Sequence, residues 1–213
     1  MPTEIPPQAS RRALLGGLFA APMLAVPMLA AAPGAAQAQA GGAMALVKSV
    51  ADQLVVIING PGSVAEKRPR LRQVLNTSVD VDNIGRFCLG RFWNSATPEQ
   101  QRTYLELFRS VLENNISARL GDYMGVKVVL LRSQQRDDTE VVSSTVERPN
   151  SPPALVDWIV GKPSGTMKII DLVAEGTSMR LTQRSDYGAF LGRNGGNVQA
   201  LLDAMRQQIA RNA

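Results

Sequence analysis

Two aspartates and a tyrosine, Asp157, Asp171 and Tyr104, are the residues of this chain best suited to acid–base chemistry on an apolar substrate. They would act in this way only if burial raised the pKa of a carboxyl group toward neutral pH. The chain contains no histidine, which excludes a Ser-His-Asp triad, a Cys-His nucleophile and a histidine-containing zinc site. A small cone-shaped α+β enzyme that uses one of the three residues remains an alternative interpretation.

A second acidic pair and the single cysteine give weaker chemical signals. Asp171 and Glu175 lie at the end of a predicted strand and in the turn after it, where structural hydrogen bonding is the favoured interpretation. Cys88 lies between Phe87 and Leu89, and a thiol in such apolar surroundings behaves as a small hydrophobic group with a raised pKa. One cysteine cannot form an intramolecular disulfide. We therefore predict no catalytic residue and no metal site.

Positive charge is spread along the chain rather than clustered. There are 23 Lys and Arg residues against 18 Asp and Glu, a net charge of +5, and 5% of the residues are aromatic. This composition argues against a nucleic-acid surface with stacking side chains and leaves an anionic membrane surface or an acidic partner open. Arg91, Arg180 and Arg184 could pair with a phosphate group, although surface solvation or salt bridges are the favoured interpretation.

The first forty residues are typical of an export signal rather than of a fold. Paired arginines precede an uncharged run over 13–32 that prolines interrupt, which disfavours a permanent membrane helix. The serine and arginines before this run also resemble a twin-arginine signal. Ala38 and Ala40 offer an A-x-A cleavage site. We therefore predict a signal peptide over 1–40 and a single exported domain over 41–213.

The residues named above must be positioned by a fold that begins with four helices. Apolar residues recur at helical spacing in four successive segments, 44–59, 63–75, 79–90 and 97–120. Thr97 is a candidate N-cap, and Pro98 suits the first position of the longest helix. Gly90 suits the end of the third helix.

The second predicted helix has a basic outer face. It consists of Lys67, Arg68, Arg70 and Arg72. Such a run of charge is usually a solvated face, and this is the favoured interpretation. An alternative interpretation is an exported adaptor protein that binds membrane complexes and has a filled core. This face would then be its contact surface.

Four segments rich in β-branched residues follow the helices. They are 126–131, 140–147, 154–160 and 167–173. The polar breaks between them are too short for crossover helices, so we predict an antiparallel meander. Both faces of the first and last strands are apolar, which permits cover on both sides. Two further helices, one beginning at Met179 and one over 197–210, complete an α+β fold in which helices wrap a four-stranded antiparallel sheet.

Two blocks of residues, in the same order along the chain, carry a family resemblance. The first block is Leu89-Gly90-Arg91-Phe92-Trp93, then Ala96-Thr97-Pro98-Glu99-Gln100 and 104–108. The second block is Met167-Lys168-Ile169-Ile170-Asp171-Leu172, then Glu175-Gly176-Thr177-Ser178-Met179 and Arg184-Ser185. Together they resemble the signatures of the MlaC-type periplasmic phospholipid-binding proteins, also called the toluene-tolerance family. The resemblance extends over about 44–206.

This resemblance implies a soluble, non-enzymatic carrier in the periplasm. Its fold would enclose an apolar cavity between helices and sheet, with phospholipid as cargo and no cofactor. Its partners would be an outer-membrane lipoprotein complex and an inner-membrane ABC transporter complex with its lipid-binding subunit, between which it shuttles lipid to maintain lipid asymmetry. Burying a CH₂ group gains about 0.8 kcal/mol, so acyl chains need such an escort to cross water.

Apolar residues of the predicted helices and strands are the candidates for the wall of that cavity. They are Phe87, Phe92, Tyr104, Phe108, Val128, Leu130, Val142, Val146, Trp158, Ile169, Leu172, Met179, Tyr187 and Leu191. An ordinary core position is an equally good interpretation of each one. Periodicity indicates burial, but it does not indicate whether the interior is filled.

Overall fold

The structure is a computed structural model that describes residues 34–211. Residues 1–33 of the predicted signal peptide lie outside this range. The first helix, α1, spans Gly34–Asn59. It therefore begins ahead of the predicted cleavage position after Ala40, and cleavage there would leave its segment 41–59 in the mature chain.

The first helix is a core helix of the domain. Its segment Gly41–Asn59 is long and apolar enough to cross a membrane by length and composition alone. In the structure its residues Ala43, Val47, Val50 and Ile57 are at most 3% exposed. These positions recur every three, four or seven residues and therefore lie on one side of the helix, which packs against the sheet.

The next three helices begin and end at the residues that their caps require. They are α2 (Val64–Ser78), α3 (Val81–Leu89) and α4 (Pro98–Ala118), with short 3₁₀ turns at Gly90–Trp93 and Leu120–Tyr123. Capping boxes start two of them, Ser63 with Glu66 and Thr97 with Gln100. Gly90 ends α3 with φ 60°, a conformation that favours glycine. The four predicted helices are confirmed.

The sheet is antiparallel, with strands in sequence order. Its strands are β1 (Lys127–Arg136), β2 (Thr139–Arg148), β3 (Ser151–Gly161), β4 (Lys168–Ala174) and β5 (Thr177–Ser178). The four predicted strands and the α+β class are confirmed. The short β5 is an addition, since two residues carry no alternation for a pattern to detect.

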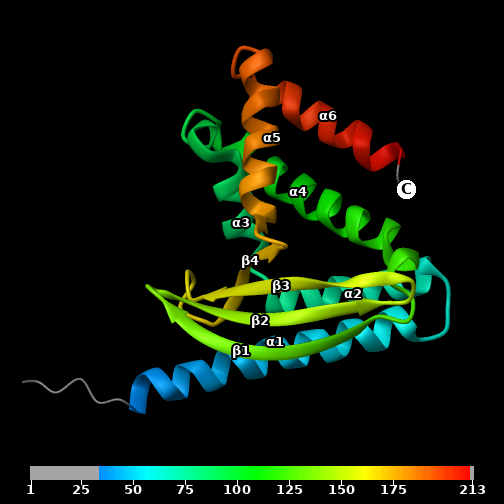
Figure 1. Ribbon diagram of the computed structural model, residues 1–213. Coiled ribbons are helices and arrows are strands. Elements are labelled where there is room, and N and C mark those ends of the chain that lie inside the picture. Colours follow the sequence, from blue (N-terminus) through cyan, green and yellow to red (C-terminus); the bar gives the residue numbers. More distant parts are fainter. Residues whose placement is uncertain (1–33, 212–213) are drawn as a thin grey trace, which may run out of the picture. The chain divides into compact units, whose positions relative to one another are not determined.

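Register places the apolar candidates of the strands on one face of the sheet. Val128 pairs with Val146, and Trp158 pairs with both Val142 and Leu172. Side chains alternate along a strand, so all five lie on the same side. Figure 1 shows α1 and α2 along the sheet, and their buried residues share a core with this face.

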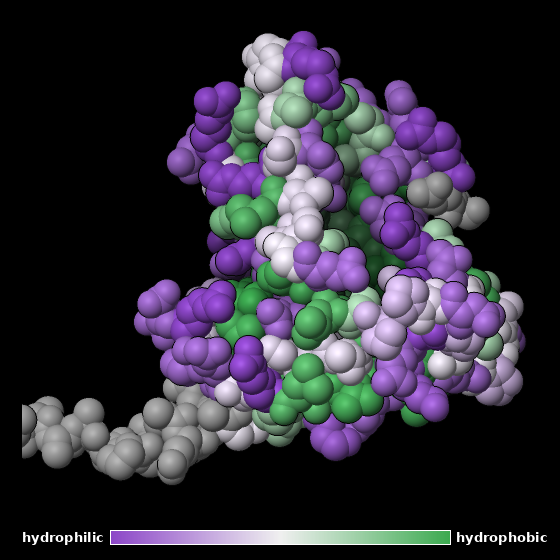
Figure 2. All heavy atoms as spheres, viewed as in Figure 1, coloured by the Kyte–Doolittle hydropathy of each residue, from purple (hydrophilic) through white to green (hydrophobic). Residues whose placement is uncertain are grey.

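The other face of the sheet carries exposed hydrophobic side chains. Val129, 46% exposed, and Leu155, 55% exposed, both pair with Thr145 on this face. Hydrophobic residues come to the surface over the strands in Figure 2. The first strand is therefore covered on one side only.

The remaining helices build a second core beside β4. The helices α5 (Met179–Arg193) and α6 (Val198–Arg211) pack with α3 and α4 (Figure 1). We call the "helical core" the buried set Val81, Cys88, Leu89, Ala96, Tyr104, Phe108, Val111, Tyr187, Leu191, Val198, Leu201, Leu202 and Met205. We call the "sheet core" the buried set Ala43, Val47, Val50, Ile57, Val74, Val142, Trp158, Val160 and Ile169. Val79 packs against both cores.

Candidate lipid-binding site

The fourteen candidate wall residues divide between the two cores. Those in or packed on the helical core are Phe87, Phe92, Tyr104, Phe108, Tyr187 and Leu191. Those in or packed on the sheet core are Leu130, Val142, Trp158, Ile169 and Leu172. Val128 and Val146 are half-buried partners on the same sheet face. Met179 is 47% exposed at the first turn of α5.

Two of the open hollows in the surface of the described part of the chain lie on or beside the helices. One, of about 290 Å³, lies between α1 and α2, and the other, of about 170 Å³, lies at the start of α3 beside Lys168. None of the fourteen candidates lines either hollow. The candidates belong mainly to two adjoining apolar cores, and Val79 packs against both.

A cluster of aromatic rings fills the centre of the helical core. Tyr104 lies 5.8 Å from Phe108 and 6.1 Å from Tyr187, measured between ring centroids. The Tyr104 hydroxyl donates to the carbonyl oxygen of Gly85 at 2.9 Å. Burial raises the pKa of both tyrosines above the usual range for a phenol, so both remain protonated at neutral pH.

Tyr187 differs from Tyr104 in one respect. Its hydroxyl oxygen is buried and has no hydrogen-bond partner among residues 34–211. A buried polar group without a partner costs about 1–3 kcal/mol. The hydroxyl is therefore an unused hydrogen-bond donor inside an apolar core.

The polar atom of Trp158 is satisfied within the sheet. Its indole N–H donates to the Ser144 hydroxyl at 2.9 Å, and Ser144 donates in turn to the carbonyl oxygen of Val156 at 3.1 Å. Because this polar edge is bonded, the rest of the indole can face hydrocarbon without cost. Trp158 suits the wall of an apolar site.

Asp171 has a structural role. Its carboxylate accepts hydrogen bonds from the backbone N–H groups of Leu172 and Arg180 and from the Ser178 hydroxyl, and it lies 3.4 Å from Nε of Arg180. These bonds tie the end of β4 to the first turn of α5. The structural interpretation of this carboxylate is therefore confirmed.

The three acid–base candidates do not converge. Asp157 lies on the exposed side of the sheet, opposite Ser143, whereas Tyr104 is buried in the helical core. No hydrogen bond joins any two of Asp157, Asp171 and Tyr104 in the described part of the chain. These three residues therefore do not form an acid–base pair in the described part of the chain.

Arginines stack on the aromatic rings at the edge of the helical core. The guanidinium carbons of Arg180 and Arg184 lie 4.5 Å and 4.8 Å from the centroid of Phe87, and that of Arg91 lies 4.9 Å from Phe92. Stacking of this kind contributes about 0.5–2 kcal/mol per pair. No pattern in the sequence indicated that Arg180 and Arg184 would share one ring, because Phe87 comes from a different helix.

Cys88 is an inert core residue, as its neighbours indicated. It is 1% exposed. Burial, followed by the nearby charge of Asp171, raises its pKa to about 12. A thiol with this pKa is almost entirely protonated at neutral pH and is a poor nucleophile.

The sequence patterns did not indicate that Glu113 and Glu140 are buried, and they placed Lys67 wrongly. Glu140 is 2% exposed; one carboxylate oxygen accepts from the Ser133 hydroxyl and the other has no partner among residues 34–211. Its spacing of two from buried Val142 was the signal that could have revealed it. The prediction that Lys67 lies on a solvated face is wrong: it is 7% exposed and donates to the carbonyl oxygen of Ile58 at 2.9 Å.

Known proteins resemble this chain in sequence and in fold. The family model described as MlaC protein matches residues 48–207. The intermembrane phospholipid transport system binding protein MlaC of Haemophilus influenzae is 22% identical over 175 residues, which cover 78% of this chain and 81% of the relative. A phospholipid-binding protein from Ralstonia solanacearum, solved in complex with a phospholipid, is 25% identical with a TM-score of 0.71, over 79% of this chain and 97% of that one.

The family match covers most of the domain and includes both blocks that carried the resemblance. It begins within α1 and ends within α6, so it takes in both cores. The expected α+β fold agrees with the solved structure. The chain belongs to the MlaC family.

Proposed function

We propose that the protein binds phospholipid through its acyl chains and carries it through the periplasm without catalysing a reaction. The observation that carries this proposal is the likeness to a Ralstonia solanacearum protein solved with a phospholipid bound, which extends over 97% of that protein's chain. The name of the Haemophilus influenzae relative, a binding protein of an intermembrane phospholipid transport system, supports the same role. The acid–base candidates lie apart, which supports a binding protein rather than an enzyme.

The acyl chains would enter along the junction of the two cores. Both sides of this junction supply apolar wall candidates, and Val79 touches both cores. A pocket for a drug-sized ligand occupies about 300–1,000 Å³ and is mostly apolar, whereas the open hollow near Lys168 is smaller and lined largely by polar residues. Loading would therefore part the two cores, and the free hydroxyl of Tyr187 could then donate to an ester carbonyl of the lipid.

Polar contacts cross this junction at β4, where Asp171 accepts hydrogen bonds from the Ser178 hydroxyl and from the backbone N–H of Arg180 in α5. The chain crosses it at Val79, next to a backbone bond of 3.0 Å from Asp80 N–H to the carbonyl oxygen of Ile169. Arg72 of α2 forms an ion pair of 2.8 Å with Glu113 of α4. A partly exposed pair of this kind contributes roughly 0–1 kcal/mol. Acyl chains between the two cores would restore the apolar packing that parting them removes.

The proposed route runs between two membranes. Exchange partners would be an outer-membrane lipoprotein complex and an inner-membrane ABC transporter complex, as the family resemblance implies. A carrier with a closed, water-soluble surface suits this role, because the acyl chains would stay out of water between the two complexes.

Purification from cells without detergent provides the test. We expect extracted lipid, identified by mass spectrometry, to contain phospholipid in fixed proportion to protein. The loaded protein should also transfer labelled phospholipid between liposomes faster than an equal amount of heat-unfolded protein does. Protein that carries no phospholipid and does not accelerate transfer would contradict the proposal.

A further inference from the structure

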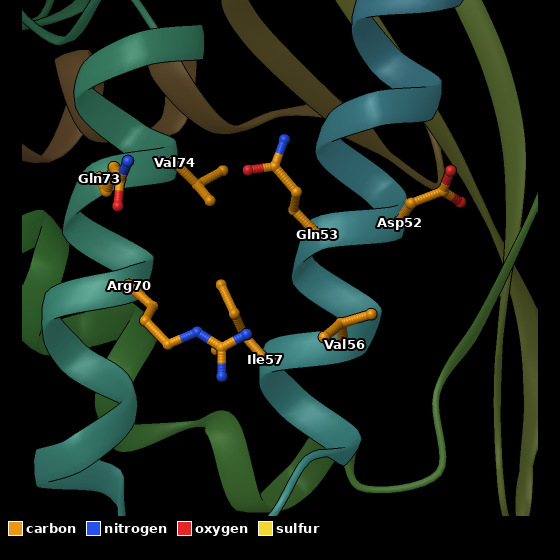
Figure 3. A pocket seen from close by; sticks show the side chains of 7 residues that line it. All are labelled: Asp52, Gln53, Val56, Ile57, Arg70, Gln73 and Val74. Atoms are coloured by element: carbon orange, nitrogen blue, oxygen red, sulfur yellow. The ribbon is translucent and has the colours of Figure 1, made fainter.

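The open hollow between α1 and α2 is a groove with an apolar floor. Ile57 of α1 and Val74 of α2 form the floor, each 3% exposed. Val56 lies at its edge and is 57% exposed. Figure 3 shows the groove from close by, with its lining side chains projecting from the two helices. Val56 is therefore the apolar side chain of this lining that a partner could reach.

The groove carries one uncompensated charge. Figure 3 shows Arg70 extending from α2 toward Ile57 of α1. No carboxylate among residues 34–211 lies within bonding distance of its guanidinium. The acidic residue of the groove, Asp52, is already paired with Lys48 at 2.7 Å. The charge left over in the groove is therefore positive.

The basic run of α2 now divides into distinct roles. Lys67 caps the end of α1 and Arg72 pairs with Glu113. Arg70 is the member of the run that lines the groove. Gln73, one turn further along α2, adds a side-chain amide to the same lining. The face that the sequence indicated as basic thus brings a single arginine to an apolar floor.

We infer that this groove docks a helix of a protein partner that brings one carboxylate to Arg70 and one apolar side chain to Val56 and Ile57. The groove lies between two helices, whose backbone groups are bonded internally and offer no edge to an added strand. Helices seat in such grooves through side chains three and four positions apart. A membrane surface would call for a cluster of basic residues, and the described lining of the groove has one free cation.

This inference rests on the proposed function in one respect, because a carrier that unloads at membrane complexes needs a surface by which they recognise it. None of the fourteen wall candidates lines the groove. Docking and lipid content can therefore be changed separately.

Photo-crosslinking in cells tests the inference on the full chain. A benzoylphenylalanine placed at Gln73 should, on irradiation, join a peptide of another protein in which Asp or Glu lies within one helical turn of an apolar residue. Placed at Gln134, exposed on β1, it should give no such product. Arg70→Glu should lower the crosslink yield at Gln73 at least about tenfold. Arg70→Lys should retain most of the yield. Arg136→Glu, the matched charge reversal outside the groove, should retain all of it.

A charge exchange completes the test. Replacing the partner's carboxylate by arginine should restore the crosslink to the Arg70→Glu protein. A crosslink to lipid, to a second copy of this chain or to a peptide that lacks a carboxylate would overturn the inference. So would a crosslink yield that Arg70→Glu leaves unchanged, or the absence of any crosslinked product. Phospholipid taken up from liposomes by the purified proteins keeps the two proposals apart. Arg70→Glu should take up as much phospholipid as the wild-type protein, and a wild-type protein that takes up none would refute the carrier alone.

Discussion

Removing one hydroxyl from each of two tyrosines in the same core should change stability in opposite directions. Tyr187→Phe removes a buried hydroxyl that has no partner among residues 34–211. Tyr104→Phe removes a hydroxyl that donates to the carbonyl oxygen of Gly85 at 2.9 Å. The two rings lie 6.1 Å apart, so the surroundings are closely matched and only the hydrogen bond differs.

The expected sizes follow from these contacts. An unpaired buried hydroxyl costs about 1–3 kcal/mol, so Tyr187→Phe should raise the free energy of unfolding of lipid-free protein by about 1 kcal/mol. Tyr104→Phe loses a net hydrogen bond and should lower it by about 1 kcal/mol. With an m-value of about 2 kcal/mol per molar in urea, the midpoints of the two variants should differ by about 1 M.

Urea titration of delipidated protein, followed by circular dichroism, is the measurement. Equal m-values for the two variants would show that the denatured states are alike. Should Tyr187→Phe lower the midpoint as much as Tyr104→Phe does, its hydroxyl has a partner in solution and the reasoning is refuted. In lipid-loaded protein the advantage of Tyr187→Phe should shrink, because the variant cannot form the proposed bond from this hydroxyl to a lipid ester.

Three further predictions concern other sites. Burial raises the pKa of Cys88 to about 12. At pH 8 this thiol should therefore react with a thiol reagent at least about 100-fold more slowly in folded protein than in urea-unfolded protein. Equal rates would contradict its burial. Val128→Asp, on the sheet face toward α1, should lower the phospholipid content several-fold, whereas Val129→Asp on the exposed face should leave it unchanged; equal losses would refute the proposed wall. Lys67→Ala, which frees a carbonyl at the end of α1, should lower the free energy of unfolding by about 1–3 kcal/mol, against about 0.5 kcal/mol or less for Arg70→Ala; equal melting temperatures would contradict the cap.

Local signals predicted the elements well because each rests on a few neighbouring residues. The capping box at Thr97 and the glycine conformation at Gly90 are set by the chain itself. Alternation likewise governs the side of the sheet on which Val142 and Trp158 lie, and the register pairs them directly. The boundaries differ from prediction where β1 extends into polar residues as far as Arg136 and where α1 begins at Gly34 rather than at Met44.

The division of the candidate site into two cores could not be predicted in this way. Periodicity gives Tyr104 and Trp158 the same signal, burial on one face, yet they lie in different cores. Which buried faces meet depends on how α3 to α6 pack beside β4, and this packing is encoded in interactions between residues far apart in the chain. The stacking of Arg180 and Arg184 on Phe87 depends on the same packing.

Two adjoining packed cores are compatible with a carrier when the energies are compared. Moving about 15 CH₂ groups of one acyl chain out of water gains about 12 kcal/mol, as much as the whole free energy of unfolding of a typical domain, about 5–15 kcal/mol. Bound cargo would thus offset the free energy needed to separate the helical core from the sheet core, while an empty protein would close and keep both cores dry. If the hollow existed without lipid, its apolar walls would have no packing partners in the unloaded state. Two cores that meet at Val79 and close on release avoid that cost, and the same packing that stabilises the empty protein would then help to expel its cargo.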